Sequence, residues 1–260
     1  MEFKKMDGAG NDFVVVDNRT GFFNLSQHEI AHICHRRFGV GADGLMTLDQ
    51  ADEGHHFVMR YYNSDGRLGS MCGNGGRCIA AFAFLLGMGK ELNFIGFDGE
   101  HRASILEWNT LSDKGIVDLG MRDVECNTLR KMEGGVFIDT GSPHFVVEVA
   151  DIEHFDVYHE GRRLRNRTDL FPEGANIDFV QPQADGRLAL RTYERGVEDE
   201  TWACGTGVTA AALVMNCNHL SARGGEFEVC FNKTNESFKN VHLIGPVSLN
   251  YSGQWTSSQA

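Results

Sequence analysis

Residues 71–75 read Met-Cys-Gly-Asn-Gly, and residues 203–207 read Ala-Cys-Gly-Thr-Gly. In both stretches a cysteine stands directly before Gly-x-Gly, and an alanine-rich apolar segment follows. The two cysteines, Cys72 and Cys204, lie 132 positions apart in a chain of 260 residues. Because self-similarity at a fixed offset is the signature of repeated architecture, these stretches suggest an internal duplication.

Two further pairs of segments support the duplication. The run GNDFVVV from Gly10 resembles GSPHFVV from Gly141, and RYYN at 60–63 resembles RTYE at 191–194. In the first pair Phe13 matches Phe145 at an offset of 132 positions, and the second pair is offset by 131. Three matches in one order at nearly one offset favour duplication over chance. We therefore predict two similar lobes, residues 1–122 and 123–244, with the join inside the polar stretch 121–133.

Local patterns predict the contents of each lobe. Runs of β-branched and aromatic residues predict strands at 13–16, 136–138 and 145–149, and alternating polarity predicts another at 187–193. Segments rich in alanine, leucine and methionine that follow glycine predict buried helices at 76–86 and 208–220. Each lobe is thus expected to combine a sheet with one central helix, which is an α/β fold of the α+β kind.

The composition excludes several classes of protein. With 42% hydrophobic residues the chain can form a core and is not disordered. Its 24 Lys and Arg against 36 Asp and Glu give a net charge of -12, which argues against a nucleic-acid partner. The longest apolar run, 79–86, is too short for a membrane span, and the N-terminal residues carry no export signal. We expect a cytoplasmic protein with no membrane partner.

The cysteine content points to thiols rather than disulfides or metal ligands. Seven cysteines are an odd number, and they are spread over a chain too large to need disulfide cross-links. No CxxC pair occurs, so the sequence gives little support for a structural zinc site. A cysteine with a special role must therefore be identified from its local setting.

Cys72 and Cys204 have such a setting, because each precedes the start of a predicted helix. A thiol there lies beside unpaired backbone N–H groups and the positive end of the helix dipole, which favour the thiolate. The glycines at 73, 75, 205 and 207 let backbone N–H groups approach an anion such as a carboxylate. Two such thiols on opposite sides of one carbon could remove a proton from one face and return it to the other. This chemistry is racemisation or epimerisation, and it requires no cofactor.

At these residues the chain closely resembles the diaminopimelate epimerases. The resemblance covers nearly the whole sequence and rests on the following motifs: MDGAGNDFVVVDN (6–18), VGADG (40–44), YNSDG (62–66), MCGNGGRC (71–78), GSPHFVV (141–147), GANIDFV (174–180), YERG (193–196) and ETWACGTG (200–207). It implies an isomerase without cofactor or metal that interconverts LL- and meso-diaminopimelate in lysine and peptidoglycan synthesis. It also implies a curved, mostly antiparallel sheet around the central helix of each lobe, a tail (245–260) that returns to the first lobe, and a homodimer.

The same resemblance assigns roles to individual residues. Cys72 and Cys204 would be the acid/base pair, and His144 and Glu194 would lie beside the thiols and tune their protonation. Substrate would be bound by a larger set. The backbones of Gly73, Asn74, Gly205 and Thr206 would hold the reacting carboxylate, Asn11 would lie near the reacting amino group, and Asn63, Asn176 and Arg195, with Ser142 and Glu194 nearby, would hold the distal end.

Two positions depart from the commonest pattern of the family. Gly44 stands where many members carry glutamine, which removes one substrate contact. Ser142 stands where many carry asparagine, and its shorter hydroxyl can still donate one hydrogen bond. Judged without the resemblance, Asn11, Asn63 and Asn176 would read as turn residues, His144 as a loop histidine, and Glu194 with Arg195 as a solvated pair.

Other functions compete with the epimerase. His28-Glu29-Ile-Ala-His32 matches the HExxH motif of zinc hydrolases, but Ser26 and Glu29 also form a capping-box pattern that would occupy the glutamate. The GxGxxG match at 39–44 leads into a strand rather than a helix, the reverse of a dinucleotide site. Proline or hydroxyproline racemases share the two-cysteine chemistry, and a non-catalytic amino-acid-binding protein would bind substrate without needing either thiol.

Overall fold

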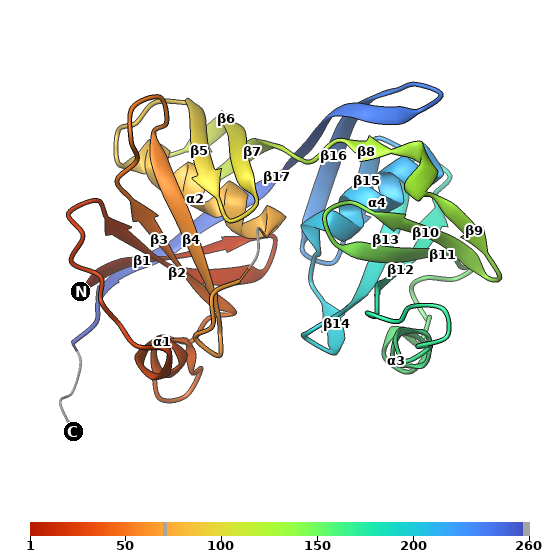
Figure 1. Ribbon diagram of the computed structural model, residues 1–260, viewed down its shortest axis with the longest axis horizontal. Helices are drawn as coiled ribbons and strands as arrows, with labels where there is room; N and C mark the ends of the chain where they lie inside the picture. The colour runs from red at the N-terminus through yellow and green to blue at the C-terminus, as the bar shows by residue number, and fades with distance from the viewer. Residues whose placement is uncertain (70–71, 257–260) are drawn as a thin grey trace. The chain divides into compact units, whose positions relative to one another are not determined.

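The computed structural model describes residues 1–69 and 72–256. Met71 of the first cysteine motif and residues 257–260 of the expected tail therefore lie outside the described residues. The chain divides into two compact units (Figure 1): unit 1 holds Met1–Leu119 and the segment that starts at Pro246, and unit 2 holds Gly120–Gly245.

The described residues of unit 1 form a sheet and two helices. In chain order its elements are β1 (Glu2–Gly8), β2 (Asn11–Asn18), α1 (Gln27–Cys34), β3 (Gly44–Asp49), β4 (Phe57–Asn63), α2 (Gly73–Leu85), β5 (Glu91–Gly96), β6 (Gly99–Asn109) and β7 (Lys114–Gly120). Consecutive strands are neighbours, and only the pairs β2–β3 and β4–β5 are parallel. The outer part of β17 (Ser237–Gln254) pairs antiparallel with β1, with Met6 opposite Leu249, and β17 also pairs with β7. These pairings close the sheet into a barrel-like wall.

Unit 2 repeats this plan. Its elements are β8 (Val124–Glu125), the 3-10 turn η1 (Cys126–Thr128), β9 (Arg130–Met132), β10 (Gly135–Asp139), β11 (Pro143–Glu148), α3 (Val157–Arg165), β12 (Asn176–Pro182), β13 (Leu188–Glu194), β14 (Asp199–Thr201), α4 (Gly205–Met215), β15 (His219–Ala222), β16 (Gly225–Lys233) and the first part of β17. From β10 to β17 the pairs run antiparallel, parallel, antiparallel, parallel, antiparallel, antiparallel. This is the order of β1 to β7, so the predicted fold class of two duplicated α+β lobes is confirmed.

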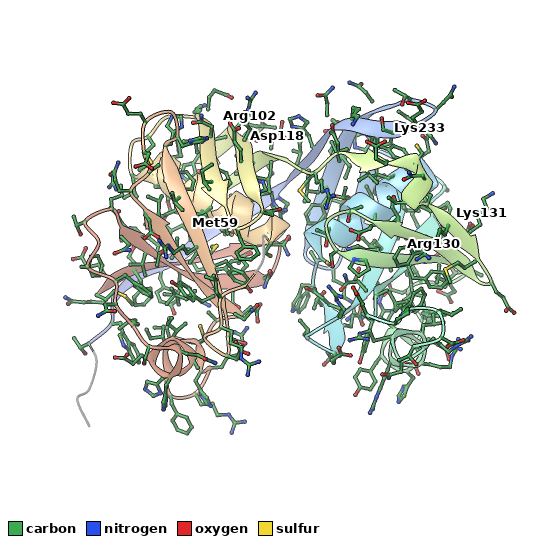
Figure 2. All side chains as sticks on the ribbon, viewed as in Figure 1. Met59, Arg102, Asp118, Arg130, Lys131 and Lys233 are labelled. Atoms are coloured by element: carbon green, nitrogen blue, oxygen red, sulfur yellow. The ribbon has the colours of Figure 1, made fainter. Side chains whose placement is uncertain are left out.

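One helix lies at the centre of each unit. Every residue of α2 from Gly73 to Ala83 is buried, and in α4 only Thr206 of the residues from Gly205 to Leu213 is partly exposed. Apart from the buried Asn74 and Arg77 of α2 and the buried Thr209 of α4, these buried residues are apolar on all sides, and such a helix must be covered on all sides. In unit 1 the cover includes the buried Met59 of β4 (Figure 2), whose Cε would lie 3.5 Å from a Cβ placed on Gly75.

The structure contains every predicted element, and the largest difference in boundaries is at the end of the second central helix. The four predicted strands lie in β2, β10, β11 and β13, and both central helices begin three residues earlier than expected, directly after a cysteine. The prediction of helix to residue 220 is wrong, because α4 ends at Met215. Asn216 has a left-handed backbone (φ 52°) that stops the helix. Leu220 is apolar because it is buried in β15, where it pairs with Leu188.

The HExxH segment forms the start of α1, and its glutamate is engaged in a cap. The Glu29 carboxylate accepts hydrogen bonds from the Ser26 backbone N–H (2.8 Å) and hydroxyl (2.6 Å), and Ser26 Oγ accepts from the Glu29 N–H. The predicted capping box is therefore confirmed. Among residues 1–69 and 72–256, no group of three or more His, Cys, Asp or Glu side chains is placed to hold a metal ion. In the same part of the chain, no helix is both long and apolar enough to cross a membrane.

A network of charges fixes the loop that follows β1. Asp12 forms ion pairs with Lys5 and with Arg36 (2.8 Å), and Lys5 also donates to Gly41 O at 2.7 Å. Burial raises the pKa of Asp12, but the hydrogen bonds and charges of Arg36 and Lys5 outweigh it and hold that pKa at about 2. The network ties β1, β2 and the segment before β3 together next to Asn11.

Replacing Asp12 by Asn is expected to destabilise the fold in a pH-dependent way. Because the pKa of Asp12 is lower in the folded chain, the stability it contributes is present above its unfolded pKa and is lost as the pH falls through about 2. Urea unfolding should show that Asp12→Asn costs about 2 kcal/mol at pH 7, with the difference shrinking between about pH 4 and pH 2. Asp17→Asn, which breaks a more exposed pair with Arg19, serves as the control and should cost less. A cost that is the same at every pH would contradict this assignment.

Candidate active site

Cys72 and Cys204 occupy the same position in their units, the residue immediately before the central helix. Their backbone angles are nearly equal, with φ −118° and ψ 121° at Cys72 and φ −111° and ψ 112° at Cys204. Each cysteine carbonyl accepts the first helical hydrogen bond, from Gly76 at 2.7 Å and from Val208 at 2.8 Å. The N–H groups of the residues between each cysteine and the residue that donates to it belong to the first turn, and no helical carbonyl is available to accept from them. Both helix starts are therefore suited to hold a carboxylate.

In unit 1 the amide of Asn11 lies beside the thiol. Asn11 Nδ2 donates to Asp43 Oδ2 at 2.8 Å, which turns Asn11 Oδ1 toward Cys72 Sγ (3.6 Å) and Asn74 Nδ2 (3.3 Å). The orientation follows from chemistry, because an ionised Asp43 can only accept. The structure thus brings the predicted residues Asn11, Cys72 and Asn74 together, and it adds Asp43, which the sequence reasoning did not identify.

A buried cation lies one helical turn from Cys72. The Arg77 side chain is fully buried, and its guanidinium donates to Gly73 O (3.2 Å) and Asn74 Oδ1 (3.0 Å). Burial lowers the pKa of Arg77 to about 10, and the nearby thiols of Cys78 and Cys72 act in the opposite direction. Arg77 is therefore charged at neutral pH, and its positive charge favours a thiolate at Cys72.

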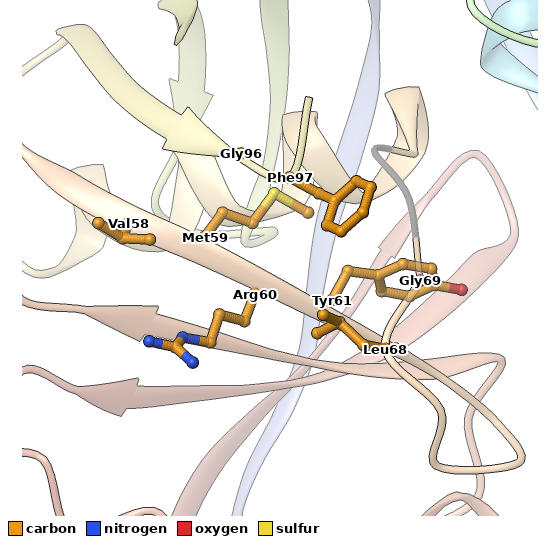
Figure 3. A pocket seen from close by; sticks show the side chains of 8 residues that line it. All are labelled: Val58, Met59, Arg60, Tyr61, Leu68, Gly69, Gly96 and Phe97. Atoms are coloured by element: carbon orange, nitrogen blue, oxygen red, sulfur yellow. The ribbon is translucent and has the colours of Figure 1, made fainter. Parts of the chain in front are cut away.

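The neighbouring ring of Tyr61 explains why residue 44 is a glycine. Gly44 pairs with Asn63 in the sheet, and a Cβ on Gly44 would lie 2.4 Å from Tyr61 Cε2 and 3.0 Å from the Tyr61 hydroxyl oxygen. Tyr61 therefore occupies the space that a longer side chain at residue 44 would need. Figure 3 shows Tyr61 on β4 together with Gly69, where an added Cβ would meet the same ring at 2.6 Å.

Tyr61 also borders a small hollow on unit 1. The hollow has a volume of about 190 Å³ and a mainly apolar lining (Figure 3): Val58, Met59, Arg60, Tyr61, Leu68, Gly69, Gly96 and Phe97. None of the site residues predicted from sequence lines it, so we do not count it as part of the candidate site.

In unit 2 the thiol belongs to a buried chain of hydrogen bonds. Cys204 is 7% exposed, and its Sγ lies 3.4 Å from Thr206 Oγ1, which lies 2.9 Å from His144 Nε2. His144 Nδ1 contacts Asp178 Oδ2 at 2.7 Å, and Thr192 Oγ1 donates to Asp178 Oδ1 at 2.7 Å. The structure thus links the predicted residues Cys204, Thr206 and His144 and continues the chain to Asp178.

The surroundings of Cys204 disfavour its thiolate. Burial raises the pKa of the Cys204 thiol well above its usual value, and the negative charges of Glu194 and Asp178 raise it further. The Thr206 hydroxyl and the Gly207 N–H lower that pKa, but their effect is smaller. Cys204 is therefore held as a thiol at neutral pH, in contrast to the cationic surroundings of Cys72.

Asn176 joins the predicted residues at the ends of three strands. Its amide nitrogen donates to Ser142 Oγ (3.0 Å) and Pro143 O (3.1 Å), and its Oδ1 accepts from the Arg195 N–H at 2.8 Å. Arg195 Nη1 donates to Glu173 O at 3.2 Å, and Thr201 Oγ1 donates to Glu194 Oε2 at 2.9 Å. Asn176 is only 3% exposed, and its hydrogen bonds hold this end of the sheet together. Asn63 lies at the exposed end of β4 in unit 1.

Removing the charge of Glu194 is expected to make Cys204 more acidic. In Glu194→Gln the carboxylate no longer opposes a thiolate at Cys204, so the pH midpoint of Cys204 alkylation by iodoacetamide should move to lower pH. Mass spectrometry of the Cys204 peptide separates this thiol from the other cysteines. Glu160→Gln, a change on the surface helix α3, should leave the midpoint in place. An unchanged or higher midpoint in Glu194→Gln would show that Glu194 does not act on this thiol.

Comparison with known proteins identifies the family of the chain. A family model described as "Diaminopimelate epimerase" matches residues 3–120 and 136–236. The chain is 43% identical over 257 residues to the diaminopimelate epimerase of Flavobacterium psychrophilum, which covers 95% of this chain and 96% of that protein. It is 38% identical over 264 residues to the diaminopimelate epimerase of Chlorobaculum tepidum, which covers 96% of this chain and 100% of that protein.

Solved structures at low identity show the same fold. A phenazine biosynthesis protein of the PhzF family from Bacillus anthracis aligns with a TM-score of 0.70 at 14% identity and covers 99% of each chain. A hydroxyproline epimerase from Agrobacterium vitis, solved with bound trans-4-OH-L-proline, aligns with a TM-score of 0.70 at 14% identity and covers 98% of this chain and 90% of that one. From the family model and the curated relatives, the chain belongs to the diaminopimelate epimerase family.

Proposed function

We propose that this isomerase interconverts LL- and meso-diaminopimelate with Cys72 and Cys204 as its two acid/base groups. The single observation that carries the proposal is the repeated cysteine geometry in a member of this family. Each unit places a thiol at the first turn of its central helix with nearly identical backbone angles. Two equivalent groups are what a reaction needs when a proton leaves one face of a carbon and returns to the other.

The reaction proceeds by one proton transfer on each face of the α-carbon. A thiolate removes the α-proton and becomes a thiol, and the carbanion takes a proton from the other thiol, which becomes a thiolate. Carbanion formation beside a carboxylate is difficult, so the charge that develops on the carboxylate oxygens needs donors. The backbone N–H groups of Gly73, Asn74, Gly205 and Thr206, in the first turns of α2 and α4, supply them. No cofactor takes part in these steps.

We propose that the two thiols begin in opposite protonation states, as this reaction requires. Arg77 places a buried positive charge near Cys72 and favours the thiolate there, whereas Glu194 and Asp178 place negative charge near Cys204 and favour the thiol. With Cys72 as the resting base and Cys204 as the resting acid, one direction of the reaction starts without prior proton exchange between the two groups.

We take the contacts to the substrate from the resemblance to the family. Asn11, oriented by Asp43, receives the reacting amino group. Asn63, Asn176 and Arg195 hold the second amino-acid head, with the Arg195 guanidinium bound to its carboxylate. Glu194 and Ser142 border the same region. We extend the proposal to a cytoplasmic homodimer, as the resemblance implies.

Proline-type racemisation is the rival function, since a hydroxyproline epimerase has this fold. A cyclic imino acid has no second amino-acid head, so it would give Asn63, Asn176 and Arg195 nothing to bind. Assays with diaminopimelate and with proline therefore distinguish the two activities.

Single replacement of either cysteine by alanine is expected to abolish epimerisation. With reduced protein, conversion of LL- to meso-diaminopimelate, followed by chiral chromatography, should fall at least about 10³-fold in Cys72→Ala and in Cys204→Ala, because each removes an essential proton carrier. Cys217→Ala, a replacement of a thiol outside both helix starts, should keep the activity.

Three outcomes would contradict the proposal. Full activity in either variant would show that the reaction does not use both thiols. Racemisation of proline without conversion of diaminopimelate would be consistent with the two-thiol chemistry but would refute the assignment of diaminopimelate as the substrate. Substrate binding without conversion by the unaltered protein would indicate a binding protein.

A further inference from the structure

We propose that Asp178 is a positioning residue for catalysis, and that Asp178, His144 and Thr206 form a proton relay that ends at Cys204. The inference rests on the proposed function, since it concerns how one of the two catalytic thiols is deprotonated. Neither the sequence patterns nor the resemblance assigned a role to Asp178.

The relay lies wholly within unit 2 and joins three elements around α4. His144 comes from β11 and Asp178 from the adjacent parallel strand β12, and both side chains are fully buried. Thr206 belongs to the first turn of α4, between Cys204 and the body of the helix. The contacts run from Sγ of Cys204 to Thr206 Oγ1 (3.4 Å), to His144 Nε2 (2.9 Å), and from His144 Nδ1 to Asp178 Oδ2 (2.7 Å).

Only one direction of hydrogen bonding satisfies every member of this chain. An ionised Asp178 can only accept, so His144 Nδ1 carries the proton and donates to it. His144 Nε2 is then an acceptor, which fits its second neighbour, since the Asn176 amide nitrogen lies 3.4 Å away and can only donate. Thr206 donates its hydroxyl proton to Nε2, and its oxygen is left to accept from the Cys204 thiol. All donors therefore point from the thiol toward the carboxylate.

This direction is the one that deprotonates the thiol. The Cys204 proton passes to Thr206 Oγ1 while the Thr206 hydroxyl proton passes to His144 Nε2, which leaves a thiolate and an imidazolium. The Asp178 carboxylate lies against the imidazolium, so the positive charge forms next to a buried negative one. The same steps in reverse return a proton to Cys204. The relay thus connects the two protonation states that Cys204 must alternate between.

The neighbours of Asp178 hold its carboxylate in one orientation. Thr192 Oγ1 of β13 donates to Oδ1 at 2.7 Å, which leaves Oδ2 for His144. Gly207 packs against the same oxygen so closely that a Cβ there would lie 2.5 Å from Asp178 Oδ1. The glycine after Thr206 therefore makes room for Asp178 in addition to exposing backbone N–H groups. The ionisable groups that act on Cys204 from these elements are Asp178 of β12 and Glu194 of β13, with His144 of β11 linked through Thr206.

The test compares Asp178→Asn with a matched surface control. Asp151→Asn alters an Asp–His contact of similar length (3.0 Å, to His154) that is exposed to solvent. In Asp178→Asn we expect kcat to fall about 100-fold or more with KM little changed, because general acid/base assistance contributes on this scale. Nitrogen-15 NMR of histidine should show His144 protonated at Nδ1 in the unaltered protein and shifted from that tautomer in the variant. Asp151→Asn should change neither quantity.

Several results would overturn the relay. An unaltered kcat in folded Asp178→Asn would do so, and so would a His144 protonated at Nε2 in the unaltered protein, a measurement that does not depend on whether the variant folds. Thr206→Val supplies a second check, because it removes the hydroxyl link and leaves the His144–Asp178 pair, so kcat should fall in this variant too. If Cys204→Ala retains epimerisation, the proposed function itself is refuted. If Asp178→Asn retains epimerisation while Cys204→Ala loses it, the two-thiol mechanism stands and only the relay is refuted.

Discussion

The structure depends on one constraint: a helix that is apolar on every side must be buried on every side. Apart from Arg77 and Thr209, residues 76–83 of α2 and 207–213 of α4 are apolar, and all of them are buried. In each unit the sheet surrounds the helix with alternating parallel and antiparallel pairs. The sides of the helix are taken up by packing. The N–H groups of its first turn have no acceptor within the helix, and in both units a cysteine directly precedes this turn. Covering the helix therefore also creates the chemical site.

The units share this plan but differ in electrostatics. The first turn of α2 has a buried guanidinium, Arg77, beneath it, whereas the corresponding turn of α4 faces the carboxylates of Glu194 and Asp178. Duplication supplies two similar thiols, and divergence of the surrounding side chains gives them different electrostatic surroundings. In the proposed reaction both are needed, because one group must accept a proton while the other holds one.

The repeat and the cysteine motifs were sufficient to predict the fold class and the central helices, and local patterns predicted the strands β2, β10, β11 and β13. Within units, the structure also brings together predicted residues such as Asn11 with Cys72 and His144 with Thr206. What the sequence could not reveal depends on strand register. Asp178 meets His144 because β11 and β12 are parallel neighbours, and Asp43 reaches Asn11 from the start of another strand. The end of α4 was missed because Leu220 fits an apolar helix as well as a buried strand, and only the left-handed Asn216 decides between them.

The central claim is that two separate groups handle the proton, and the isotope content of the earliest products tests it directly. LL-diaminopimelate would be incubated with the reduced protein in deuterium oxide and the reaction stopped after a few per cent conversion. With two thiols, the new meso product should carry one solvent deuterium at the inverted α-carbon, while the remaining LL substrate stays unlabelled because its own proton returns to it. Equal labelling of both isomers, or a product that retains the substrate hydrogen, would mean that a single group serves both faces and would contradict the account.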